Sequence, residues 1–131
     1  MRRAAQEAGV TVEIDSAGTG DWHVGHPPDP RAQKTALRYG LDISGYCARQ
    51  IEAADFARFT HIFALDRSNL SHIRALGPPG CDARIGLLLD MVAGREGQDV
   101  ADPYYGDDQA FEKTWSDVDL AARMLVRKLM A

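Results

Sequence analysis

The sequence predicts one α/β domain over residues 1–131, in which helices cover both faces of a mostly parallel sheet, giving three layers. Short apolar runs of strand length alternate along the chain with helical patterns, and this alternation is typical of parallel sheets. A composition of 45% hydrophobic and 26% charged residues is sufficient for one buried core. A chain of 131 residues also has the usual length of a single domain.

Three apolar runs are predicted strands. Residues 10–14 (VTVEI) are mostly β-branched, residues 60–64 (THIFA) have the pattern of a buried strand, and residues 85–89 (IGLLL) form the third run. Ligands of parallel sheets bind at the loops beyond the carboxyl ends of the strands. We therefore expect the site among residues 15–25, 66–69 and 102–106.

Helix boundaries are marked by capping residues. Residues 1–8 are rich in helix formers and end at Gly9. Asp29 followed by Pro30 predicts a helix start, and Gly40 predicts its end. Asp66 predicts the cap of a further helix, which the turn at residues 77–80 (GPPG) stops.

A long amphipathic helix is predicted from Gln109 onward, with Asp107 and Asp108 at its amino end, where negative charge is favourable. Its apolar residues recur at spacings of three and four, which places them on one stripe. The stripe predicts packing on the sheet, with a coiled-coil seam as the alternative. Its members are Phe111, Trp115, Val118, Ala122, Leu125 and Leu129.

Charge and cysteine content exclude several classes of protein. A net charge of −4 gives no electrostatic attraction to nucleic acid or to an anionic membrane, and no apolar run of 18 residues is present. The amino-terminal residues MRRAAQEAG lack the apolar region of a signal peptide. Cys47 and Cys81 form neither a CxxC pair nor a metal-spaced cluster, which favours free thiols over a single disulfide, so we expect a protein of the reducing cytoplasm. The four histidines also lack the spacing of a metal site, and we expect no metal or cofactor.

Five short motifs in order resemble the low-molecular-weight protein tyrosine phosphatase family. Each is weak alone, but together they extend over nearly the whole chain. The motifs are DSAGT at 15–19 with Trp22, PDPRA at 28–32, ARQ at 48–50 with Asp55 and Phe56, Asp66 with Asn69, and DPYYG at 102–106.

The resemblance implies hydrolysis of phosphotyrosine or another aryl phosphate through a cysteinyl-phosphate, without a cofactor. In the family, a Cys-x5-Arg loop between the first strand and the first helix supplies the thiolate nucleophile and cradles the phosphoryl group. Six positions after Cys47 and Cys81 lie Ala53 and Leu87, so neither cysteine begins such a loop. We therefore expect a chain that lacks the family's first central strand and its nucleophile loop, and that is inactive alone.

The resemblance assigns roles to seven residues. Asp102 matches the general acid, which protonates the leaving phenolate. Trp22, Tyr104 and Tyr105 match the aromatic walls that hold the phenyl ring. Asp15 and Ser16 match residues that brace the phosphate loop, and Asp66 is a further supporting residue at the end of a strand.

Two other functions remain open at the level of sequence. A pseudophosphatase would keep the aromatic walls to bind a tyrosine-like ligand or a protein partner without hydrolysing it. An arsenate reductase of the same fold is disfavoured, because aromatic walls suit a phenyl ring and no redox cysteine pair is present.

The missing strand also bears on assembly. In the family that strand lies between those matching residues 10–14 and 60–64, so its loss leaves two strand edges without a partner. We expect either direct pairing of these two runs or a homodimer that completes the sheet, and we favour the dimer.

Overall fold

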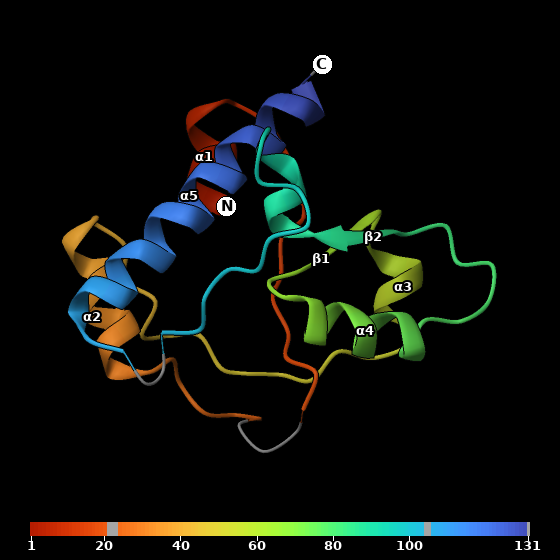
Figure 1. The fold of residues 1–131 in the computed structure, drawn as a ribbon, viewed down its shortest axis with the longest axis horizontal. Helices are drawn as coiled ribbons and strands as arrows, with labels where there is room; N and C mark the ends of the chain where they lie inside the picture. Colours follow the sequence, from red (N-terminus) through yellow and green to blue (C-terminus); the bar gives the residue numbers. More distant parts are fainter. Residues whose placement is uncertain (21–23, 104–105, 131) are drawn as a thin grey trace.

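The structure, a computed structural model, describes residues 1–20, 24–103 and 106–130. Its two layers of helices and its short sheet are drawn in Figure 1. In chain order the elements are α1 (Arg2–Glu7), α2 (Pro30–Arg38), α3 (Asp55–Arg58), β1 (His61–Ala64), α4 (Arg67–Leu76), β2 (Arg84–Leu87), the 3-10 helix η1 (Leu88–Met91) and α5 (Asp108–Met130).

The sheet of the described residues consists of β1 and β2, which pair in parallel as predicted, in a register that runs from His61 opposite Arg84 to Ala64 opposite Leu87. The predicted third strand ends earlier than expected, because η1 begins at Leu88. The Asp90 carboxylate accepts a hydrogen bond from the Leu87 amide at 3.2 Å and so stabilises this tight turn.

The predicted strand at residues 10–14 is wrong. These residues form no strand, and they do not pair with β1. The Ile14 carbonyl instead accepts a hydrogen bond from the Arg2 side chain at 2.7 Å, and Val12 remains 37% exposed. A strand forms only when a neighbour pairs with its backbone, and no described segment lies beside this run as a strand.

The expectation that β1 is a buried strand also needs correction. Only Ala64 is buried, whereas His61, Ile62 and Phe63 are half-buried. The chain as a whole exposes 8573 Å², roughly a quarter more than the about 6,800 Å² expected for a folded monomer of this mass. The sheet core is thus less covered than its apolar sequence implies.

The capping residues act as predicted. Asp29 accepts a hydrogen bond from the Arg31 amide at the start of α2, and Asp66 accepts one from the Asn69 amide at the start of α4. Gly9 and Gly40 both have positive φ angles, +71° and +80°, at the ends of α1 and α2. Such angles favour glycine, because it has no Cβ.

Helix α5 packs mainly on other helices, which differs from the packing on the sheet that its stripe predicts. It lies against α1, α2 and η1, as Figure 1 shows. Phe111, Ala122 and Leu125 of the stripe are buried, and Trp115 stacks on Tyr39 with ring centroids 4.6 Å apart. An open cavity of about 190 Å³ lies between the last turns of α5 and the two strands.

The core has two parts. Phe56, Ala64, Ile73 and Leu87 form a cluster around the sheet and α4. Leu89, Val92, Val100 and Ala121 form a second cluster beneath α5. Within the described part of the chain, no helix has the length and apolar character needed to cross a membrane.

The first core cluster depends on one aromatic ring, which gives a stability prediction. Phe56 is 2% exposed, and we expect Phe56→Ala to lower the free energy of unfolding by about 3–5 kcal/mol through lost burial and a new cavity. Leu37→Ala is the control at a site 59% exposed, where a change within about 0.5 kcal/mol is expected. Urea unfolding followed by circular dichroism measures both. Equal losses in the two variants would contradict the assignment of Phe56 to the core.

Candidate functional site

Arg49 fixes the loop that follows residues 10–14. Its guanidinium binds Asp55 through two hydrogen bonds of 3.0 and 3.1 Å and reaches Asp15 at 3.2 Å. Its backbone carbonyl accepts from the Gly18 amide at 2.8 Å, and Gly18 accepts from the Ile51 amide at 2.9 Å. Hydrogen bonding to Arg49 holds the pKa of Asp55 below its usual range. The loop is thereby tied to the chain before α3.

Asp15 and Ser16 lie together at the start of this loop. The Asp15 carboxylate accepts from the Ser16 amide at 2.8 Å as well as from Arg49. Both residues are exposed. Asp15 therefore holds the start of this loop through its contact with Arg49.

Asp66 and Asn69 link this loop to the end of β1. The Asp66 carboxylate caps α4 by accepting from the Asn69 amide at 2.7 Å. The Asn69 side-chain oxygen in turn accepts a hydrogen bond of 3.2 Å from the Thr19 hydroxyl. The loops at residues 15–20 and 66–69 thus meet, as the sequence predicts for loops at the carboxyl edge of a parallel sheet.

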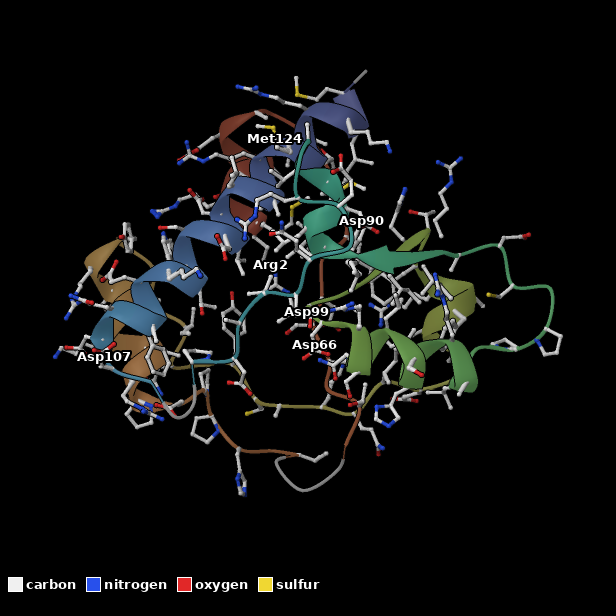
Figure 2. The ribbon with its side chains drawn as sticks, in the orientation of Figure 1. Arg2, Asp66, Asp90, Asp99, Asp107 and Met124 are labelled. Carbon is white, nitrogen blue, oxygen red and sulfur yellow. The ribbon has the colours of Figure 1, made fainter. Side chains whose placement is uncertain are left out.

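The segment that leads to Asp102 passes the same end of β1. The Val100 amide donates to the Leu65 carbonyl at 2.7 Å, and the Asp99 carboxylate accepts from the Arg67 amide at 2.9 Å. Asp66 and Asp99 lie close together in Figure 2. The loops at residues 15–20 and 66–69 therefore lie at this edge of the sheet, and the segment that precedes Asp102 passes it.

The loop that carries Asp102 is anchored on both sides. We call residues 101–103 and Gly106 the Asp-Pro loop. The Thr114 hydroxyl of α5 lies 3.0 Å from the carbonyl oxygens of both Ala101 and Ala110, which share its one proton as acceptors, and Arg31 of α2 donates to the Gly106 carbonyl at 3.3 Å. The Gly106 amide donates to the Pro103 carbonyl at 2.8 Å. Asp102 itself is exposed between these anchors.

Three predicted site residues, Trp22, Tyr104 and Tyr105, lie outside the described residues. Among the described residues, a shallow hollow of about 560 Å³ is lined by Val24 and residues 49–52.

The two cysteines are free thiols in the structure. Cys47 is exposed, whereas Cys81 is half-buried and packs against the cluster around Phe56. Among the residues with described positions, no three histidine, cysteine or acidic side chains gather in a way that could hold a metal ion.

Sequence reasoning missed the organising roles of Arg49 and Arg31. Both lie inside motifs that carry the resemblance, yet neither received a role, whereas Asp15, a partner of Arg49, did. Arg49 and Asp55 are six positions apart, so their contact had a local signal in the sequence. The contact between Arg31 and Gly106 joins residues 75 positions apart, and no local pattern indicates it.

Comparison with known proteins agrees with this geometry. The family described as low molecular weight phosphotyrosine protein phosphatase matches residues 1–131. A curated relative of that name from Schizosaccharomyces pombe is 37% identical over 114 residues, which cover 85% of this chain and 72% of the relative. Low molecular weight phosphotyrosine protein phosphatase 1 of Drosophila melanogaster is 42% identical over 94 residues. That match covers 72% of this chain but only 60% of the relative's length.

The fold gives the same assignment. The crystal structure of Primo-1 superposes with a TM-score of 0.92 at 33% identity and covers 99% of this chain and 86% of the other. YfkJ from Bacillus subtilis superposes with a TM-score of 0.88 at 31% identity, covering 98% and 81%. The chain therefore belongs to the low-molecular-weight phosphotyrosine protein phosphatase family.

Proposed function

We propose that this chain provides the acid catalysis and substrate recognition of a phosphatase that acts on phosphotyrosine proteins or other aryl phosphate monoesters. The observation that carries the proposal is the placement of Asp102, which is exposed in a loop that Thr114 and Arg31 anchor on either side. A general acid must be accessible and held at hydrogen-bonding distance from the leaving oxygen. Family membership supplies the reaction in which such an acid acts.

In the proposed reaction, this chain supplies the general acid, and the nucleophile is a thiolate other than that of Cys47 or Cys81. The thiolate forms a bond to phosphorus as the bond from phosphorus to the phenolic oxygen breaks, and the Asp102 carboxyl gives its proton to that oxygen. Water then hydrolyses the cysteinyl-phosphate and releases inorganic phosphate. Trp22, Tyr104 and Tyr105 would hold the phenyl ring, and Asp15, Ser16 and Asp66 would support the neighbouring loops.

A binding function without turnover is the second candidate, and the cysteines favour it for residues 1–131 alone. Neither Cys47 nor Cys81 has arginine six positions later. Cys81 is also half-buried and packs against the cluster around Phe56. A reducing cytoplasm is the compartment that suits two unpaired thiols, and we place the protein there.

One test of the proposed function concerns activity. We expect residues 1–131 to hydrolyse p-nitrophenyl phosphate no faster than buffer, because the nucleophile and the phosphate cradle together supply most of a rate enhancement that commonly exceeds about 10⁶-fold. The measurement is vanadate-sensitive release of nitrophenolate by protein free of host phosphatases. The double variant Cys47→Ala/Cys81→Ala is the matched control. Turnover that disappears in this variant would show that one of the two thiols is a nucleophile after all.

A second test concerns Asp102 in an extended chain, with a strand and a Cys-x5-Arg loop added before Met1. Asp102→Asn cannot donate a proton, so kcat/KM for phenyl phosphate should fall about 10²–10⁴-fold. Asp107→Asn removes one charge from the same segment without changing the acid and should have little effect. Trp22→Ala and Tyr104→Ala should mainly raise KM. An active extended chain whose Asp102→Asn variant keeps its full rate would remove Asp102 from this role.

A further prediction concerns assembly. We propose that residues 1–131 form a homodimer that completes the sheet, because β1 has one strand neighbour among the described residues and the chain exposes more surface than a monomer of its mass. Sedimentation velocity at micromolar concentration should give a mass of two chains. A stable monomer with a cooperative thermal transition would refute the dimer.

A further inference from the structure

The side chain of Arg31 makes contacts in three directions at the start of α2. Its Nε and Nη2 atoms bind the two carboxylate oxygens of Asp29 at 3.2 and 3.0 Å, and its Nη1 atom donates to the Gly106 carbonyl at 3.3 Å. Its guanidinium also lies over the ring of Phe111 in α5, 4.8 Å from the centroid. This one side chain therefore joins α2, α5 and the Asp-Pro loop.

The contact with Asp29 fixes the orientation of this guanidinium. The Asp29 carboxylate also accepts from the Arg31 amide at 2.7 Å, so carboxylate and side chain are held to the same turn of backbone. Hydrogen bonding to Arg31 lowers the pKa of Asp29, which keeps this carboxylate charged. A planar fork that is already oriented loses little further entropy when it binds a third group.

The loop has little freedom at the point where Arg31 holds it. A Cβ added to Gly106 would lie 2.4 Å from the Ala110 side chain, so the Gly106 backbone rests directly on the first turn of α5. Asp107 follows at once and caps this helix by accepting from the Ala110 amide at 3.1 Å. Arg31 thus acts on a backbone that is already close to α5.

We propose that Arg31 is a positioning residue that holds the Asp-Pro loop, and with it Asp102, in the geometry needed for proton donation. Thr114 fixes the residue before Asp102, and Arg31 fixes the end of the loop at Gly106. A displacement of about 1 Å in a reacting group can cost on the order of 10²-fold in rate. The role of Asp102 rests on the proposed function, whereas the anchoring of the loop does not.

Arg38 offers a matched control on the same helix. It also joins α2 to α5, through Glu112 at 2.6 Å and Asp108 at 3.6 Å, and its side chain is 42% exposed against 40% for Arg31. None of its described contacts reaches the Asp-Pro loop. Both Arg31→Gln and Arg38→Gln therefore remove one positive charge and a contact between α2 and α5. Only Arg31→Gln also removes the hydrogen bond to the Gly106 carbonyl.

Amide hydrogen exchange on residues 1–131 tests the anchor without any activity. Arg31→Gln should speed exchange at Gly106 by about tenfold, the effect of losing one charged hydrogen bond. Arg38→Gln should leave it unchanged, and Arg31→Lys should lie between, because lysine keeps the charge but lacks the fork. Equal exchange at Gly106 in the two glutamine variants would overturn the proposal. Amide exchange does not depend on catalysis, so this outcome can be distinguished from failure of the proposed reaction.

The dependence of rate on leaving group tests the catalytic consequence in the extended chain. Proton donation matters for phenyl phosphate and much less for 2,4-dinitrophenyl phosphate, whose phenolate leaves without a proton. Arg31→Gln should lower kcat/KM at least tenfold for phenyl phosphate and leave kcat/KM for 2,4-dinitrophenyl phosphate nearly unchanged. Arg38→Gln should change kcat/KM for neither substrate. Equal losses on both substrates would show that Arg31 only supports the fold, and would reject a positioning role.

Discussion

The parallel pairing of β1 with β2 determines where the candidate site forms. Strands that run in the same direction end at the same edge, and this pair ends at Ala64 and Leu87. The chain leaves β1 through Leu65, whose carbonyl binds Val100, and then reaches Asp66. Asp66 and Asp99 meet at this strand end, and the chain continues from there to the loop that carries Asp102. Without this pairing, residues far apart in sequence would have no common place to meet.

Two arginine side chains hold the loops that flank the short sheet. The sheet of the described residues has two strands, and side chains tie its flanking loops in place. Arg49 ties the loop at residues 15–20 to Asp55, and Arg31 ties the Asp-Pro loop to Asp29 and α2. Both use the planar fork of the guanidinium, which binds a carboxylate through two parallel hydrogen bonds and fixes its geometry.

The same short sheet explains the exposure of the core. Phe63 and Ile62 have the apolar character of a buried strand, yet they are half-buried, because β1 has a strand neighbour on one side only among the described residues. Buried apolar area is the main favourable term in folding, so a strand left half-exposed contributes less to stability. The long helix α5 packs mainly on α1, α2 and η1 rather than on the sheet.

The sequence by itself determined helices α1, α2, α4 and α5, the parallel class of sheet and the loops that carry the candidate site. Caps such as Asp29 and Asp66 act within one helical turn, so their effect can be predicted from neighbouring residues. Tertiary structure decided whether residues 10–14 form a strand, because a strand depends on a neighbour and not on β-branched residues alone. It also decided the roles of Arg31 and Arg49. Their partners lie up to 75 residues away, and only the packing of α2 against α5 brings Arg31 to Gly106.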